Sequence, residues 1–298
     1  MSEEVVHPLK KYTRPHVRKT TTCPGCGNGI IAQAFLRAVD ELEMDMDRFV
    51  FVSGIGCSAW IPSPLFNADT LHTTHGRPVP FAMGVKLGRP DLNVVVVSGD
   101  GDLTAIGGNH LIHAARRNIG LKVILVNNGI YAMTGGQTAP TTPRGVNTAT
   151  NPYGNLEPAF DVSSLVMAAG APFVARWTTF HPRQITKTIK KAISSEGFSF
   201  IEIISQCPVQ FGKVTGTGSA LQLLKHYQQN SVRINKARTM DPEQLNGKII
   251  VGEFLDMRKL SPAAILQGGL AKSASGPAGP ELSAEWGRLK QRVMEGGS

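Results

Sequence analysis

Long apolar runs are missing from this 298-residue sequence. A membrane-spanning helix needs roughly 20 consecutive apolar residues, and a run as short as Val94–Val97 predicts a buried strand instead. The first twenty residues also lack the apolar segment of a secretory signal. We therefore expect a cytoplasmic protein with no membrane span.

Cysteine is scarce, which argues against a disulfide framework. Of the four cysteines, two form Cys23-Pro24-Gly25-Cys26, and Cys57 and Cys207 stand alone. That number suits one four-thiolate metal centre, either structural zinc or a [4Fe–4S] cluster. Zinc commonly takes its second pair as another close CxxC, whereas Cys57 and Cys207 lie 150 positions apart. The residues thus favour the cluster and leave zinc open.

Acidic residues are outnumbered, with 22 Asp and Glu against 31 Lys and Arg, for a net charge of +9. The basic residues are scattered except for clusters at 10–18, 187–191 and 213–238, and no aromatic-rich nucleic-acid motif accompanies them. We expect solvated faces and an acidic protein partner, such as a small electron carrier, and no nucleic acid.

The rest of the sequence alternates between strand-like and helix-like segments. Apolar or β-branched runs predict strands at 49–52, 94–98, 123–126, 173–175, 198–204 and 248–254. Helices are predicted at 29–42, 79–87, 106–117 and 182–193, and residues 160–169 continue the alternation. This rhythm predicts an α/β fold with a mostly parallel sheet covered on both faces. Residues 134–158, rich in Gly, Thr, Asn and Pro, form a candidate functional loop.

Composition divides the chain into three parts. Residues 1–20, polar and basic, predict an N-terminal arm lying on a neighbour, and residues 21–225 predict the main domain. Residues 226–298 turn polar and include a Gly/Ser/Ala/Pro-rich stretch at 268–280. We expect this C-terminal extension to contact partner subunits and to be partly mobile.

Two predicted neighbouring strands end in polar turns, Gly99-Asp100-Gly101-Asp102 and Asn127-Asn128-Gly129. Ligands bind at the carboxyl ends of strands in an open parallel sheet, so both turns are expected at one ligand site. The glycines allow backbone amides to approach phosphate, and Asp100, Asn128 and the Ile130 carbonyl would suit a hard divalent cation. Either turn alone could simply end a strand, but the pair at this spacing favours a metal-anchored diphosphate.

Several motifs of the sequence together resemble those of a known family. CPGCGNG, SGIGCS, TTHGRPVPFAMGVK, SGDGDLTAIGGNH, NNGIYAMTGGQTAPTTP and the late Cys207-Pro208 are similar to the β subunits of 2-oxoacid:ferredoxin oxidoreductases. The similarity runs in the correct order from about residue 20 to about residue 210. It implies a three-layer thiamine-diphosphate-binding fold and one [4Fe–4S] cluster close to the cofactor.

The resemblance also implies individual roles. Mg²⁺ would be held by Asp100, Asn128 and Ile130, and the cluster by Cys23, Cys26, Cys57 and Cys207. Residues expected to contact thiamine diphosphate are Ile55, Gly56, Cys57, Ser58, Gly84, Gly101, Asp102, Ala132 and Met133. His75 and Arg77 would face the reacting end as catalytic residues, although His75 could instead be a buried, hydrogen-bonded histidine.

Thiamine diphosphate is normally activated by a Glu on a second domain, for which this chain has neither room nor motif. The resemblance implies an α subunit that carries this Glu, coenzyme A as co-substrate, and a ferredoxin or ferredoxin-like subunit as electron acceptor. The expected reaction is coenzyme A-dependent oxidative decarboxylation of a 2-oxoacid to acyl-CoA and CO₂, or its reverse.

Substrate is less sharply indicated. THGR and TTPRGVNTATNPYGN are closer to the 2-oxoglutarate-type β subunits than to the pyruvate type, and Arg77 is a candidate partner for a distal carboxylate. Trp60 replaces a basic residue often found there in relatives, which would favour an apolar or aryl 2-oxoacid. Pyruvate and branched-chain 2-oxoacids remain alternatives. A non-redox thiamine lyase and a zinc-stabilised binding module are the competing classes.

Overall fold

The computed structural model describes residues 7–17, 20–216, 218–257, 259–262 and 264–266. The chain divides into two compact units, Met1–Ser261 and Pro262–Ser298. The first carries the whole sheet, and in the second Pro262 and residues 264–266 are helical. No helix within these described ranges has the length and apolar character needed to span a membrane.

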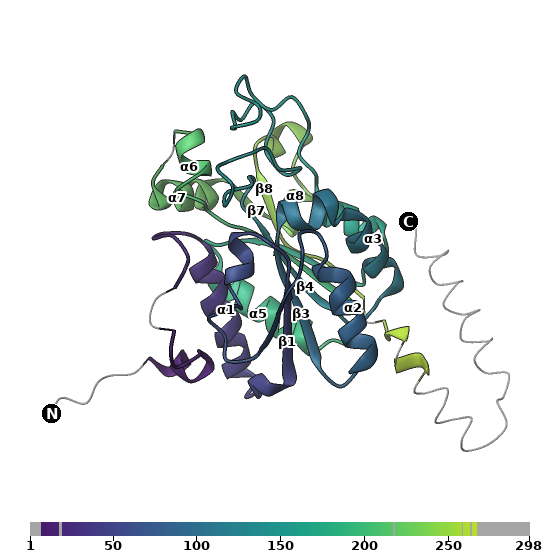
Figure 1. Ribbon diagram of the computed structural model, residues 1–298. Helices are drawn as coiled ribbons and strands as arrows, with labels where there is room; N and C mark the ends of the chain where they lie inside the picture. The colour runs from purple at the N-terminus through teal and green to yellow at the C-terminus, as the bar shows by residue number, and fades with distance from the viewer. Residues whose placement is uncertain (1–6, 18–19, 217, 258, 263, 267–298) are drawn as a thin grey trace, which may run out of the picture. The chain divides into compact units, whose positions relative to one another are not determined.

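The first unit is built around one eight-stranded sheet, with strand order β2-β1-β3-β4-β6-β5-β8-β7 (Figure 1). Neighbouring strands are parallel except β5 and β8, which are antiparallel. The strands are β1 (Phe49–Ser53), β2 (Asp69–His72), β3 (Asn93–Gly99), β4 (Lys122–Asn127), β5 (Phe173–Thr178), β6 (Ser199–Ile204), β7 (Ser231–Arg233) and β8 (Ile249–Asp256).

Helices connect these strands on both sides of the sheet. The α-helices are α1 (Asn28–Glu41), α2 (Pro78–Gly88), α3 (Gly108–Arg117), α4 (Val162–Ala168), α5 (Pro182–Ile193), α6 (Phe211–Val214), α7 (Ala220–Asn230) and α8 (Ile234–Ala237). Shorter 3₁₀ segments are η1 (Pro8–Tyr12), η2 (Met46–Arg48), η3 (Cys57–Trp60) and η5 (Pro242–Leu245), and η4 (Asp102–Ile106) is a π-helical turn directly before α3.

Alternating residues of the strands pack into two separate hydrophobic cores, one on each face of the sheet. Val95 and Val97 of β3 join the core beneath α1 and α5, whereas Val94 and Val96 join the core beneath α2, α3 and α4. In Figure 1, α1 and α5 lie on one side of the central strands and α2 and α3 on the other. Burial on both faces explains why the central strands are continuous β-branched runs. The predicted three-layer α/β fold with a mostly parallel sheet is confirmed.

The order in which strands are added to the sheet changes direction between β1 and β3. From β1 the chain passes to β2 on one side, and β3 then returns to the other side of β1. Such a reversal leaves a crevice at the carboxyl ends of the two central strands, where ligands bind in open α/β sheets. The polar turns after β1 and β3 therefore lie at the topological position for a site.

The predicted terminal segments contact the main body where they are described. In the arm, Arg14 donates from Nε to the Phe66 carbonyl at 2.9 Å, and Tyr12 donates to Asp40 Oδ1 at 3.0 Å. In the extension, β8 pairs with β5, and β7 lies beyond β8 at the sheet edge. The domain boundaries, and contacts of either segment with partner subunits, stay predictions. The 268–280 stretch, including its predicted mobility, lies outside the described residues.

Candidate functional site

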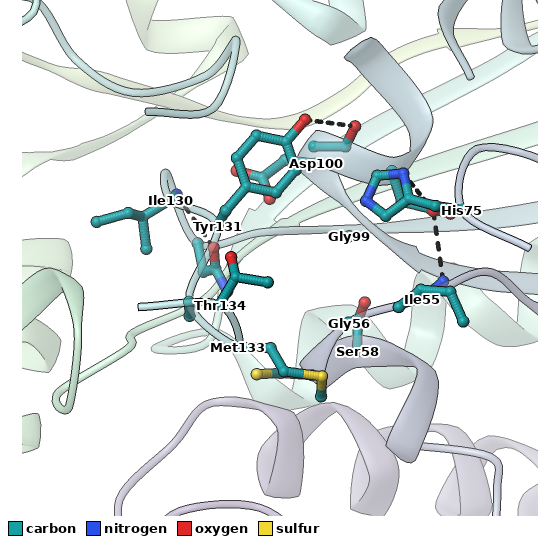
Figure 2. A pocket seen from close by; sticks show the side chains of 15 residues that line it. Ile55, Gly56, Ser58, His75, Gly99, Asp100, Ile130, Tyr131, Met133 and Thr134 are labelled. Carbon is teal, nitrogen blue, oxygen red and sulfur yellow. Dashed lines mark hydrogen bonds and ion pairs between the residues drawn. The ribbon is translucent and has the colours of Figure 1, made fainter. Parts of the chain in front are cut away.

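A pocket opens at the carboxyl ends of β1 to β4. The loop after β1, the loop after β2, the β3–η4 turn and the loop after β4 all contribute to it. Figure 2 shows Ile130, Tyr131 and Thr134 on one side, His75 and Ile55 on the other, and Gly99 and Asp100 between them. The lining residues are Ile55, Gly56, Cys57, Ser58, His75, Gly99, Asp100, Gly101, Asp102, Asn128, Ile130, Tyr131, Ala132, Met133 and Thr134.

Asp100 is the buried anion of this pocket, with 3% of its surface exposed. Its Oδ2 accepts hydrogen bonds from the Gly129 amide at 2.9 Å and from the Thr141 hydroxyl. Burial nevertheless raises the pKa of its carboxyl to about 6, because the hydrogen bonds only partly offset the desolvation of the charge. A divalent cation would supply the missing positive charge, so the residue fits the predicted Mg²⁺ ligand.

The other two predicted ligands lie on the neighbouring turn. Asn128 and Ile130 line the same pocket as Asp100, and the Ile130 amide donates to Asn128 Oδ1 at 3.2 Å. The preceding Asn127 instead points to β6, where its Nδ2 donates to Glu202 Oε1 at 2.8 Å. The two asparagines therefore have different tasks. Asn128 faces the pocket, while Asn127 anchors the turn to the buried Glu202.

Ser58 provides a polar group without a partner. Its side chain lines the pocket, and its Oγ is buried with no hydrogen-bond partner within the described part of the chain. A buried hydroxyl left unpaired costs free energy, and a phosphate oxygen could accept its hydrogen bond. Gly99 lies beside it, and a Cβ there would come within 3.2 Å of Ser58 Oγ. The hydroxyl and the small neighbour fit a diphosphate group.

Asp102 ties three segments of the pocket together. Its Oδ1 accepts from the Gly76 amide at 2.7 Å and from the Ile55 amide at 3.4 Å, and its Oδ2 accepts from the Ser98 hydroxyl at 2.5 Å. His75 Nδ1 also lies 3.4 Å from Oδ1. Both carboxylate oxygens thus already have donors from the chain itself. The geometry supports a positioning role for Asp102 more directly than a cofactor contact.

Tyr131 also lines the pocket, although its sequence context predicted no role for it. Its hydroxyl donates to the Gly101 carbonyl at 3.2 Å, and a Cβ on Gly101 would come within 2.3 Å of the ring. Its ring centre lies 6.0 Å from that of His75 (Figure 2). Burial, with Asp100 and Asp102 nearby, raises the pKa of the phenol. Because Tyr131 directly follows Ile130, a predicted Mg²⁺ ligand, its position in the sequence could have marked it as a site residue. Thr141, which binds Asp100 from the 134–158 loop, was missed as well.

Two predicted site residues do not line this pocket. Gly84 is exposed on α2, and apart from its chain neighbours and the nearby backbone of that helix, no atom of the described residues lies within 4 Å of a Cβ placed there. Arg77 Nη1 donates to the carbonyls of Gly76 and Ile106 at 3.1 and 3.3 Å. Trp60 is also outside the lining, with its ring centre 6.1 Å from that of His72. The roles of these residues toward cofactor or substrate stay predictions.

Three distant segments bring the four cysteines together beside the pocket. The Gly27 amide donates to the Gln206 carbonyl at 3.0 Å, and Gln206 Nε2 donates to the Gly25 carbonyl at 3.2 Å. Asn28 Nδ2 donates to the Cys57 carbonyl at 3.0 Å. These bonds join the Cys23–Cys26 loop to the residue before Cys207 and to the loop after β1.

The cysteine thiols influence one another electrostatically. Burial raises the pKa of the Cys26 thiol to about 11, with further contributions from Cys207, Cys57 and Cys23. Burial also raises the pKa of Cys57, again with Cys207 and Cys23 nearby. Among the described residues, no three His, Cys, Asp or Glu side chains lie close enough to hold a single metal ion. A four-iron cluster would supply the cations that the partly buried Cys26 and Cys57 thiolates need.

Comparisons with known proteins agree with this geometry. Residues 54–203 match the family model described as thiamine pyrophosphate enzyme, C-terminal TPP binding domain. The 2-oxoglutarate synthase subunit KorB of Methanocaldococcus jannaschii is 52% identical over 254 residues, covering 85% of this chain and 94% of that protein. The 2-oxoacid:ferredoxin oxidoreductase subunit beta of Saccharolobus solfataricus is 38% identical, covering 74% of this chain and 70% of that protein.

A solved structure is similar over the full length. The 2-oxoglutarate:ferredoxin oxidoreductase from Magnetococcus marinus, with 2-oxoglutarate, coenzyme A and succinyl-CoA bound, aligns with a TM-score of 0.79 and 30% sequence identity. The alignment covers 100% of this chain and 98% of that chain.

Proposed function

Because the chain belongs to the β subunits of the 2-oxoacid:ferredoxin oxidoreductases, we propose that it holds Mg²⁺–thiamine diphosphate and a [4Fe–4S] cluster. With an α subunit it would oxidise 2-oxoglutarate and coenzyme A to succinyl-CoA and CO₂, or catalyse the reverse. The observation that carries this proposal is the buried Asp100 carboxylate in a pocket whose wall also contains Cys57.

The pocket residues have distinct tasks in this proposal. Asp100, Asn128 and Ile130 hold the cation, and Ser58 donates its unpaired hydroxyl to the diphosphate. Bound thiamine diphosphate supplies a carbon nucleophile and an electron sink. His75 Nδ1 lies 3.4 Å from Asp102 Oδ1, which leaves Nε2 as the nitrogen that would exchange a proton with substrate.

The remaining components come from partners. The predicted activating Glu has to be supplied by the α subunit, and electrons leave the cluster to a ferredoxin or ferredoxin-like subunit. Ile55 and Met133 line the pocket although 43% and 49% of their surfaces are exposed. Exposed apolar side chains at the pocket support closure of the site by another polypeptide. The cytoplasmic location stays a prediction.

The substrate proposal rests mainly on the relatives. Four archaeal relatives at 50 to 52% identity are named 2-oxoglutarate synthase subunits. Trp60 was the residue that favoured an aryl substrate, and it does not line the pocket. Arg77 is engaged with two backbone carbonyls, so the cation that recognises the distal carboxylate has to come from elsewhere or from a rearranged Arg77.

The test is to produce the chain with its native α subunit and assay 2-oxoglutarate, pyruvate, a branched-chain and an aryl 2-oxoacid. Each is supplied with coenzyme A and methyl viologen as electron acceptor. We expect the highest kcat/KM with 2-oxoglutarate and no reduction of viologen without coenzyme A. Preference for another 2-oxoacid would refute the substrate assignment. A colourless preparation with stoichiometric zinc would refute the cluster.

A further inference from the structure

A second depression lies apart from the cofactor pocket, on the face of the sheet that α5 covers. It is lined by Trp177, Gln184, Lys187, Thr188, Arg233, Ile234, Asn235, Val251, Gly252 and Glu253. Lys187 comes from α5, and Arg233 ends β7. These two cations belong to separate basic clusters of the sequence, 187–191 and 213–238. The fold brings the two clusters together on one surface, which we call the basic groove.

The basic groove carries positive charge that is not balanced locally. Its lining includes one carboxylate, that of Glu253. Lys191 Nζ pairs with this carboxylate at 2.6 Å and with Asp256 at 2.7 Å, so the two lining cations Lys187 and Arg233 outnumber the single lining carboxylate. No ion pair of Lys187 or Arg233 occurs in the described part of the chain, and both side chains are exposed. The Arg233 guanidinium lies over the Trp177 ring, 4.5 Å from its centre, and this cation–π contact restrains the position of the charged group.

A continuous set of contacts connects the basic groove to the cysteine loops. The Trp177 ring centre lies 5.6 Å from that of His181, and His181 Nδ1 lies 2.9 Å from Thr178 Oγ1. The next residue, Thr179, donates its hydroxyl to Gln206 Oε1. Gln206 precedes Cys207 and also binds the Gly25 carbonyl between Cys23 and Cys26. The basic groove and the cysteines are thus separated by a short series of packed residues.

We propose that the basic groove docks an acidic iron–sulfur electron carrier of the ferredoxin type. The positive surface would steer such a carrier to the molecule, and the contact series would place it near the cysteine-held cluster. In each transfer the reduced cluster loses one electron and the oxidised carrier gains it, and the 2-oxoacid is the source of the electrons. This inference rests on the proposed function and adds the surface at which the carrier binds.

The test is a double charge reversal, Lys187→Glu with Arg233→Glu, in the α/β holoenzyme. 2-Oxoglutarate oxidation is measured with a purified acidic ferredoxin and, separately, with methyl viologen, which carries positive charge. We expect KM for ferredoxin to rise roughly tenfold or more at low ionic strength, and the increase to shrink as salt screens the charges. The viologen-linked kcat should be unchanged, because neither residue lines the cofactor pocket.

The matched control is Arg116→Glu with Arg117→Glu. These two arginines are exposed at the end of α3, on the opposite face of the sheet, and the double change alters net charge by the same amount. An equal rise of KM in this control would show that only net charge matters and would overturn the docking site. An unchanged KM for ferredoxin in the Lys187→Glu, Arg233→Glu variant would also overturn it. Loss of the α subunit from that variant would overturn it as well, because the groove would then be a subunit interface. Absence of viologen-linked activity in the unmodified enzyme would instead refute the proposed function.

Discussion

A buried charge lies at each end of strand β4, with opposite consequences for its pKa. At the amino end, Lys122 is 5% exposed and donates from Nζ to the carbonyls of Ser195 and Gly197 and to Ser195 Oγ. At the carboxyl end, the Asn128 turn lies beside the buried carboxylate of Asp100. Burial lowers the pKa of Lys122 to about 7, whereas it raises that of Asp100 to about 6.

The difference lies in what surrounds each charge. Lys122 is enclosed by acceptors from one loop, so its ammonium group has partners without any ligand. Asp100 faces a pocket that also contains the Ser58 hydroxyl, which has no hydrogen-bond partner among the described residues. Desolvation of a charge is therefore a sign of a binding site only where a cavity and further unsatisfied groups accompany it. Substitutions at the two ends of the sheet test this distinction.

The largest effect is expected from Asp100→Ala. Without its carboxylate the chain loses the anion proposed to hold Mg²⁺, so retention of thiamine diphosphate and Mg²⁺ should fall by at least about 100-fold. Equilibrium dialysis of the holoenzyme, followed by cofactor analysis, measures this. Asp91→Ala is the control, because Asp91 is exposed before β3 and pairs with Arg89. Unchanged cofactor content in Asp100→Ala would remove the metal assignment.

Cys207→Ser should act on the cluster. Removing one of the four proposed thiolate ligands is expected to lower iron content to roughly half or less and to abolish ferredoxin-linked oxidation. Iron and acid-labile sulfide per chain give the readout. Ser205→Ala serves as the control, since Ser205 is buried two residues away with no hydrogen-bond partner for its Oγ within the described residues. Full iron occupancy in Cys207→Ser would show that Cys207 is not a ligand.

Asp102→Asn should separate positioning from cofactor binding. The amide can still accept from Gly76 and Ile55 but removes the negative charge beside His75. We expect kcat to fall roughly 100-fold while thiamine diphosphate retention stays nearly unchanged. Ser98→Ala, which removes one donor and keeps the charge, should retain most of kcat. If Asp102→Asn loses thiamine diphosphate to the same extent as it loses kcat, the result would instead support a direct contact between Asp102 and the cofactor.

The smallest effect is expected from Lys122→Met, on the pH dependence of the free energy of unfolding. The pKa of Lys122 is about 7 in the folded chain and 10.5 in the unfolded chain, so between these values the unfolded chain binds more protons. The free energy of unfolding should therefore rise with pH across this range, by up to about 1.4 kcal/mol per pH unit. Lys122→Met should flatten that rise, whereas Lys225→Met, at an exposed position on α7, should not. Denaturant unfolding at fixed holoenzyme concentration from pH 7 to pH 9 compares them. Equal slopes in all three proteins would contradict the assignment.

Sequence patterns were sufficient where burial alone determines structure. The β-branched runs identified the central strands, and the polar turns that follow them identified most of the pocket. Strands β2 and β7 were missed, because Asp69–His72 and Ser231–Arg233 are short, have no buried residue and lie at the sheet edges. Helix α7, Ala220–Asn230, runs across the predicted boundary at residue 225.

Contacts between distant residues were beyond the sequence. Nothing in the spacing indicates that Asp102 accepts from loops after β1 and β2, or that Thr141 in the long loop reaches Asp100. The meeting of Lys187 with Arg233 likewise depends on β8 folding back antiparallel to β5. Such contacts are set by the sheet order, which local propensity does not determine.

Cys57 lines the cofactor pocket and also interacts electrostatically with Cys23 and Cys207. Its carbonyl, moreover, is tied by Asn28 to the helix that follows Cys26. A substitution in this one loop is therefore expected to alter the cofactor pocket and the proposed cluster site together. An engineer who grafts either site onto another scaffold would have to transfer this loop with it.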